Sequence, residues 1–239
     1  MWDNPRQLNA AAGFLTALAL PVLALAAGLA VARSPLFPLR EIVVAGAPVH
    51  TSRDAIERAI EGRLRGNFFA VDLAEVRAGL EQLPWVRRVQ VRRLWPDRLE
   101  VTLAEHVPLA RWDAGGLVNL QGERFAGSGG DGLPGFAGPD GSEADVTRRF
   151  RAFVQILAPL GVAPERVVLT PRHAWRVRLN DGLAIELGRD APGDPVEARL
   201  SRLVEAYPQS LARMARKPEY VDLRYPNGFA LRVAGTKDG

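Results

Sequence analysis

The side chains that could do catalytic or metal chemistry are few and scattered along the chain. His50, His106 and His173 are the three histidines, and none has the i, i+4 spacing or shared carboxylate that a metal site uses. The six serines lie outside any G-x-S-x-G nucleophile elbow. The absence of cysteine excludes a disulfide, a thiol nucleophile and a Cys-ligated metal. This pattern favours a non-enzymatic protein without metal, cofactor or small-molecule substrate.

The chain is basic through arginine, with a net charge of +4 and lysine only at positions 217 and 237. A local cluster comprises Arg87, Arg88, Arg92, Arg93 and Arg98. Such a cluster can contact phosphates, but no nucleic-acid reading motif accompanies it. We interpret these arginines as side chains on the solvent-exposed faces of strands, and we expect no nucleic-acid partner.

An uncharged stretch near the amino terminus could anchor the rest of the chain in a membrane. Residues 10–32 are almost entirely Ala, Leu, Val and Gly, and as a helix they extend about 34 Å, enough to cross a hydrocarbon core of about 30 Å. We expect a transmembrane helix at 10–32 after a short tail at 1–9. A cleaved signal ending at Ala30-Val31-Ala32 is the alternative, although signal cores run only about 7 to 15 residues.

The flanking charges do not settle the orientation of this helix. Arg6 alone precedes the span, whereas Arg33, Arg40 and Arg53 follow it within about 20 residues. The positive-inside count therefore slightly favours a cytoplasmic location for the body of the chain.

In the first unit beyond the helix, the sequence pattern predicts the order strand, helix, helix, strand, strand. Thr51 with Asp54 predicts a capping box for the first helix, and Asp72 opens the second. Alternating apolar residues then predict a half-buried antiparallel hairpin. The expected elements are a strand at 40–45, a helix ending near 66–67, a helix stopped by Pro84, and strands at 86–94 and 99–105.

Several spaced motifs in this unit resemble the POTRA domain of FtsQ-type division proteins. They are Phe37-Pro38-Leu39-Arg40-Glu41-Ile42-Val43-Val44 with Gly46, Asn67-Phe68-Phe69-Ala70-Val71-Asp72-Leu73, Leu83-Pro84-Trp85-Val86 and Leu94-Trp95-Pro96-Asp97-Arg98-Leu99. The run from Glu105 to Trp112 resembles the exit from that domain into the second domain of the family. The resemblance implies a POTRA domain at 37–107.

The second unit is richer in strands. We interpret the glycine-rich segment 127–142 as a flexible connector, because it lacks phosphate-cradle spacing. Ser142 with Asp145, and Asp194 with Pro195, predict the starts of two helices, and Asn180-Asp181-Gly182 predicts a hairpin. The remaining strands are expected at 109–112, 117–120, 166–170, 174–179, 183–187, 220–225 and 229–233. The fold class is therefore α+β, with an antiparallel sheet and two main helices in this unit.

This region also resembles the FtsQ family, through Leu133-Pro134, Gly138-Pro139, Leu187-Gly188-Arg189 and Tyr220-Val221-Asp222-Leu223-Arg224-Tyr225. The resemblance implies a β-rich second domain at 108–239. It further implies a single-pass inner-membrane protein with a cytoplasmic amino terminus, a periplasmic body and enrichment at the division septum. The nine-residue tail is shorter than the family usually has.

The last strand offers a means of binding if it is also last in its sheet, because an open edge can pair with an extended segment. The resemblance points the same way, since FtsQ-type proteins bind FtsB, together with FtsL, through this region. Other division proteins would meet the POTRA domain and the helix. Val233 stands where the family can place Trp, so we expect the aromatic contacts with the partner to come from Tyr225 and Phe229 instead. The expected contact residues are Arg224, Tyr225, Gly228, Phe229, Ala230, Leu231 and Val233.

Three alternatives remain from the residues alone. Tyr225 and Phe229 can instead be hairpin core, just as we expect Trp85, Trp95, Trp112 and Trp175 to pack inside. A POTRA-type chaperone for exported polypeptides would bind many extended peptides weakly. A membrane-anchored cell-wall hydrolase would need a cleft with converging acid and base groups.

Overall fold

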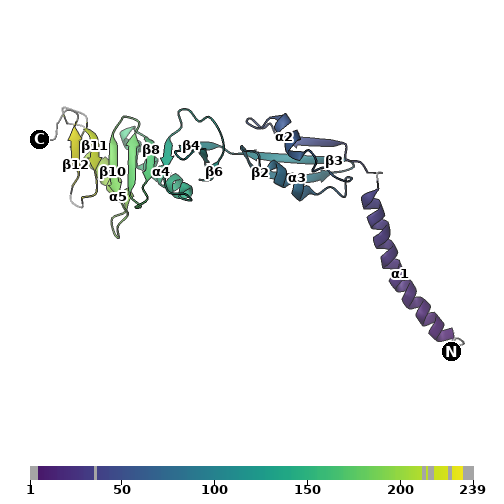
Figure 1. Cartoon of the computed structure of the whole chain (residues 1–239). Coiled ribbons are helices and arrows are strands. Elements are labelled where there is room, and N and C mark those ends of the chain that lie inside the picture. The colour runs from purple at the N-terminus through teal and green to yellow at the C-terminus, as the bar shows by residue number, and fades with distance from the viewer. Residues whose placement is uncertain (1–4, 35–36, 212–213, 215–217, 226–227, 234–239) are drawn as a thin grey trace. The chain divides into compact units, whose positions relative to one another are not determined.

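The computed structural model describes residues 5–34, 37–211, 214, 218–225 and 228–233 of the chain (Figure 1). It divides into two compact units, residues 1–105 and 106–239. Helix α1 (Pro5–Arg33) contains an apolar span from Leu8 to Val31, no part of which is buried by the rest of the described protein. The span is therefore long and apolar enough to lie in a bilayer.

The first unit is a three-stranded sheet with two helices packed against it (Figure 1). The sheet order is β1-β3-β2, with β1 parallel to β3 and β2 antiparallel to β3. The expected order of elements is confirmed. Its members are β1 (Glu41–Ala45), α2 (Arg53–Ile60), α3 (Leu73–Leu80), β2 (Val86–Leu94) and β3 (Arg98–Glu105).

The ends of the two helices test the capping predictions. Asp72 caps α3 as expected, its carboxylate accepting from the N–H groups of Ala74 and Glu75. For α2 the expected cap was wrong by one residue, because the side chain of Ser52, not Thr51, accepts from Ala55 N–H. Helix α2 also ends at Ile60 rather than near residue 66, so it is shorter than its apolar spacing suggested.

The second unit is built on a nine-stranded sheet in the order β12-β11-β10-β9-β8-β7-β4-β5-β6. Helices α4 (Glu143–Leu157) and α5 (Val196–Ala206) pack on one face, and a single 3-10 turn follows α4. The strands are β4 (Pro108–Trp112), β5 (Leu117–Asn119), β6 (Arg124–Phe125), β7 (Gly135–Ala137), β8 (Pro164–Leu169), β9 (Trp175–Leu179), β10 (Ala184–Gly188), β11 (Pro218–Asp222) and β12 (Ala230–Val233).

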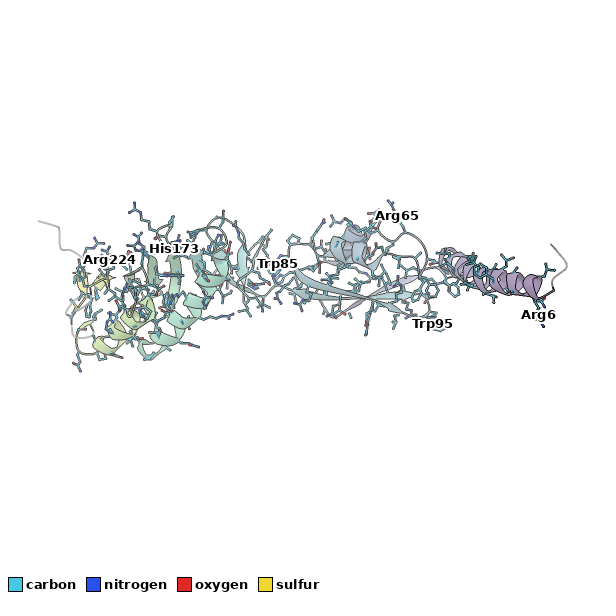
Figure 2. The ribbon with its side chains drawn as sticks, turned by 90° about the horizontal axis from the view of Figure 1, so that it is seen from below. Arg6, Arg65, Trp85, Trp95, His173 and Arg224 are labelled. Carbon is cyan, nitrogen blue, oxygen red and sulfur yellow. The ribbon has the colours of Figure 1, made fainter. Side chains whose placement is uncertain are left out.

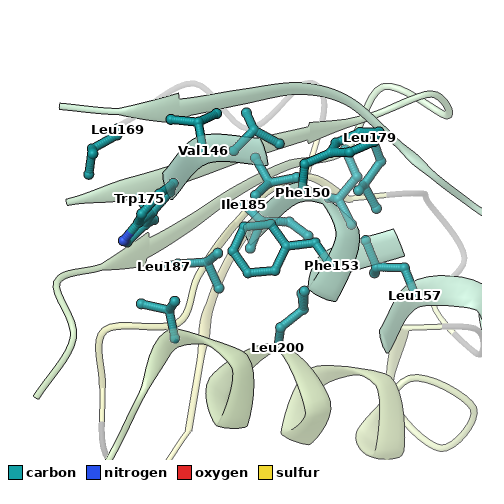
Figure 3. Close-up of a cluster of buried hydrophobic side chains, with 14 of the residues drawn as sticks. Val146, Phe150, Phe153, Leu157, Leu169, Trp175, Leu179, Ile185, Leu187 and Leu200 are labelled. Atoms are coloured by element: carbon teal, nitrogen blue, oxygen red, sulfur yellow. The ribbon is translucent and has the colours of Figure 1, made fainter. Parts of the chain in front are cut away.

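The core of this unit lies between the sheet and the two helices (Figure 3). Phe153 of α4 and Leu200 of α5 face Ile185 and Leu187 of β10 across it (Figure 3). Alternate strand residues such as Arg176 and Arg178 are exposed on the other face. The period-2 pattern of the strands thus separates a helix-covered face from a polar one.

The glycine-rich segment is not simply a connector, which corrects the sequence-based prediction. Residues 135–137 form β7, a central strand between β4 and β8, and Phe136 is fully buried. Both pairings of β7 are parallel, as is that of β10 with β11, so the sheet is mixed rather than antiparallel. A three-residue strand with one large apolar side chain carries too little periodicity to be recognised.

Helix starts in this unit also differ from the prediction. Ser142 and Pro195 occupy the N-cap positions without a side-chain cap, while the Asp194 carboxylate pairs with Arg199 instead of capping α5. Asp190 accepts from Val196 N–H in its place.

Tryptophan burial follows the prediction for Trp112 and Trp175, which are 3% and 5% exposed. Trp85 is half-buried and stacks on His50 at 3.8 Å between ring centroids. Trp95 contradicts the prediction, because 76% of its surface is exposed at the turn between β2 and β3.

Candidate partner-binding edge of the C-terminal sheet

Strand β12 is the last strand in the described sequence and also the outermost strand of the nine-stranded sheet (Figure 1). It pairs antiparallel with β11, Ala230 opposite Asp222 and Arg232 opposite Tyr220. The condition that the sequence left open, that the terminal strand also forms the edge, is therefore met within the described residues. An edge strand presents one side of its backbone as a template for pairing.

Backbone geometry decides which residues of β12 face outward. Leu223 N–H donates to Glu186 O at 2.9 Å, so Leu223 and Val221 direct their backbone groups toward β10. Tyr220 and Asp222 then direct theirs toward β12, where they form the hydrogen-bonded pairs of the antiparallel ladder. It follows that the N–H and C=O of Leu231, midway between Ala230 and Arg232, point away from β11.

Side chains of β12 alternate between the two faces of the sheet. Leu231 is half-buried and packs against the core cluster, whereas Ala230 and Arg232 are exposed. The Arg232 guanidinium lies 5.2 Å from the centre of the Tyr220 ring, a cation–π contact between neighbouring strands. The sequence-based prediction missed Arg232 and Tyr220, since only the strand register places them opposite each other.

Arg224 is already paired inside the chain, which corrects the expectation that it is available for an acidic partner. Its Nε donates to both carboxylate oxygens of Asp222, at 2.9 and 3.0 Å, and its backbone N–H donates to the same carboxylate at 3.0 Å. The hydrogen bond from the Arg224 side chain lowers the pKa of Asp222, and the same bond raises the pKa of Arg224. The pair fixes the turn that leaves β11.

Tyr225 and Phe229 lie outside the strands, because β11 ends at Asp222 rather than at residue 225 and β12 begins at Ala230 rather than at residue 229. Tyr225 is 55% exposed and is therefore not hairpin core. Phe229 is half-buried against the core, in a hollow of about 340 Å³ that it lines with Leu203, Leu223 and Gly228. Pro226 and Asn227, which separate Tyr225 from Gly228 in the sequence, lie outside the described residues.

A buried arginine holds the sheet and α5 together beside this segment. Arg199 is 6% exposed and donates to Leu187 O at 2.6 Å, to Arg189 O at 2.9 Å and to the Asp194 carboxylate at 2.7 Å. This hydrogen bond from Arg199 is the main cause that lowers the pKa of Asp194. Nη2 also donates to Asp194 O at 3.1 Å, so all three guanidinium nitrogens donate to an oxygen, as burial requires.

Gly188 allows the chain to pass close to this cluster. Its φ is +77°, and a Cβ there would lie 2.9 Å from Arg224 Cγ and 3.3 Å from Arg199 Nη1. Only glycine combines that conformation with that approach at low cost. The end of β10 and the Arg224–Asp222 pair are therefore packed directly against each other.

The histidines and acidic residues make structural contacts. His106 Nδ1 lies 2.8 Å from Asn119 Nδ2, its ring stacks on Phe125, and His173 adopts a left-handed turn with φ of 58°. Within the described part of the chain, no group of three or more His, Asp or Glu side chains could hold a metal ion.

Comparison with known proteins assigns the two units. Residues 37–106 match the family model "POTRA domain, FtsQ-type", and residues 110–224 match "Cell division protein FtsQ/DivIB, C-terminal". The chain belongs to the FtsQ/DivIB family of cell division proteins. The apolar α1 is consistent with a single-pass membrane member of this family.

Curated relatives named cell division protein FtsQ match nearly the full length of the chain. That of Burkholderia pseudomallei (strain K96243) is 46% identical over 240 residues, covering 99% of this chain and 96% of the relative. Those of Bordetella pertussis and Nitrosospira multiformis are 39% and 40% identical, covering 98% and 97% of this chain and 93% and 99% of the relatives. The family supports a role in the division machinery, and it is not known as a family of enzymes.

Proposed function

We propose that this chain is a single-pass scaffold of the bacterial division machinery that recruits FtsB, with FtsL, by adding an FtsB segment to β12. In this proposal residues 1–9 are cytoplasmic, 10–32 span the inner membrane, and the POTRA domain (37–107) and the β-rich domain (108–239) are periplasmic. The scaffold is enriched at the septum, and further division proteins meet its POTRA domain and helix.

The observation that carries the proposal is the position of β12 at the edge of the sheet, with the backbone of Leu231 directed outward. An extended segment added there gains main-chain hydrogen bonds, and its alternate side chains give selectivity. The contact residues we propose are Arg224, Tyr225, Gly228, Phe229, Ala230, Leu231 and Val233. Tyr225 offers an exposed ring in the segment that connects β11 to β12, and Arg224 acts by holding the turn through Asp222.

Two substitutions at one position test the backbone contribution. Leu231→Ala and Leu231→Pro both remove the half-buried side chain, but only proline removes the outward N–H. Proline is tolerated on an edge strand whose N–H faces away from the ladder. We expect Leu231→Pro in the full chain to weaken binding of the periplasmic segment of FtsB by about tenfold or more relative to Leu231→Ala, the cost of one lost backbone hydrogen bond.

Tyr225→Ala supplies a side-chain test. Because Tyr225 is exposed, its removal should weaken FtsB binding and leave the thermal melt unchanged. Phe229 is a poorer probe, since a charge there would also disturb the core against which Phe229 packs. Equal affinities for Leu231→Pro and Leu231→Ala, with full binding by Tyr225→Ala, would exclude β12 as the binding edge.

A further inference from the structure

The end of the POTRA unit where β2 turns into β3 exposes three large apolar side chains. Trp95 is 76% exposed, Phe69 43% and Leu94 40%. Trp85, at the opposite end of β2, is instead half-buried on His50 (Figure 2). A tryptophan that exposed is unusual on a folded domain and marks a surface that meets something apolar.

These side chains lie at the same end of the unit, although Arg93 and Leu94, as neighbours on β2, direct their side chains to opposite faces of the sheet. The Arg93 guanidinium donates to Phe68 O at 2.7 Å, Phe69 O at 3.0 Å and Val71 O at 2.8 Å, which ties the 67–71 loop to the end of β2. The Phe69 ring in turn meets the edge of the Phe37 ring at 5.2 Å. We call Phe37, Phe69, Leu94 and Trp95 the hairpin-end cluster.

The chain itself limits how far this cluster lies from the membrane. The apolar span ends at Val31, and Phe37 O, six residues later, accepts from Phe68 N–H at 2.9 Å. Farther on, Arg40 N–H donates to Asp97 O at 2.9 Å, beside Trp95. Six extended residues reach about 20 Å at most, so the 67–69 loop stays within about that distance of the end of the span whatever the orientation of the unit.

The charge around the cluster suits an anionic surface. Segments 37–41, 65–69 and 92–100 hold five arginines and three acidic residues. Three of the arginines pair with acidic residues in these segments: Arg98 with Glu41 at 3.0 Å, Arg40 with Asp97 at 3.7 Å, and Arg92 with Glu100. The net positive charge acts on lipid phosphates over about a Debye length of 8 Å.

We propose that the hairpin-end cluster inserts into the headgroup region of the bilayer that α1 spans, with Trp95 as the interfacial anchor. Tryptophan is enriched at this depth because its ring is amphipathic. Neighbouring arginines contact lipid phosphates, and the hairpin end holds the POTRA unit against the membrane. The proposal rests on α1 as a membrane span and is independent of the β12 edge.

The natural chain contains no cysteine, so one label can report on one site. The full chain carrying Leu94→Cys with an environment-sensitive fluorophore is placed in nanodiscs of phosphatidylethanolamine and phosphatidylglycerol containing headgroup-quencher lipids. Val49→Cys is the matched control, because Val49 is 84% exposed but lies beside Glu105 at the opposite end of β3. We expect strong quenching and a blue-shifted emission at position 94 and water-like emission at position 49.

Variants then assign the contact. Adding Trp95→Glu should abolish the quenching at position 94, Trp95→Phe should retain most of it, and replacing phosphatidylglycerol by phosphatidylcholine should reduce it. Binding of the FtsB segment should be unchanged in all of them, which separates this proposal from that for β12. Water-like emission at position 94, or a crosslink from it to a protein in cells with no lipid quenching, would overturn the lipid assignment.

Discussion

The two ends of the nine-stranded sheet are built differently. At one end β6 is two residues long, and Arg124 donates from Nε to Gly115 O at 2.9 Å and from Nη2 to Ala114 O at 2.8 Å. The chain at Gly127 passes so close that a Cβ there would lie 2.5 Å from the Phe125 ring. A very short, side-chain-anchored strand is a protected edge.

At the other end β12 is four residues long, and the backbone of Leu231 is directed outward. Its side chains are small or half-buried except for Arg232, which lies over Tyr220. The difference teaches that the fold closes one edge by packing and leaves the other with the backbone geometry that strand addition needs. Four substitutions test this contrast.

The largest effect is expected at the closed edge. Phe125 is 7% exposed and stacks on His106 at 4.2 Å between ring centroids. Phe125→Ala should lower the free energy of unfolding in urea by about 3 kcal/mol, while the folded protein still binds the FtsB segment with unchanged affinity. Loss of binding in the folded state would show that the two edges are coupled and would break the contrast.

Gly188→Ala should cost about 1 kcal/mol for the left-handed backbone and also displace the Arg224–Asp222 pair. Gly182→Ala is the matched control, since its φ is +93° but a Cβ there meets nothing within 4 Å. We expect a larger loss of thermal stability in Gly188→Ala than in Gly182→Ala, because only the former adds a steric clash, and weaker FtsB binding only in Gly188→Ala. Unchanged binding in Gly188→Ala would mean that the Arg224 turn does not shape the edge.

The Asp222–Arg224 pair should make stability depend on acid pH. The pKa of Asp222 is lowered in the folded chain, so its contribution is present above the unfolded value of about 3.9 and is lost as the pH falls through the folded value. The urea midpoint of the natural chain should therefore exceed that of Asp222→Asn at pH 6 and approach it near pH 3. A gap that stays constant down to pH 3 would contradict this role.

The smallest effect is expected for Arg232→Ala. Removing an exposed cation–π contact with Tyr220 should lower the free energy of unfolding by about 0.5 kcal/mol. Because the contact is already lost in Arg232→Ala, adding Tyr220→Leu should not remove that contribution of about 0.5 kcal/mol a second time. A double-mutant cycle in urea measures the coupling. Zero coupling would leave Arg232 as a solvated side chain with no role in fixing the edge strand.

Much of the fold was readable from local patterns. The strand, helix, helix, strand, strand order, the Asp72 cap and the hairpin at 180–182 follow from periodicity and turn residues that act over a few positions. The prediction failed at β7, where Phe136 is one apolar residue among glycines, and at Trp95, whose hydrophobicity suggested burial. In both cases the burial of the side chain depends on segments that are distant in the sequence, and the local composition carries no information about those segments.

The candidate site divides in the same way. The sequence by itself determined an uncharged span long enough for a bilayer, the absence of cysteine chemistry, and a final strand with turn residues before it, because these depend only on composition and short-range spacing. Only the tertiary structure decided that this strand is the sheet edge and that Leu231 directs its backbone outward. Strand order and register are set by packing across the whole sheet, and no segment of the chain specifies them alone.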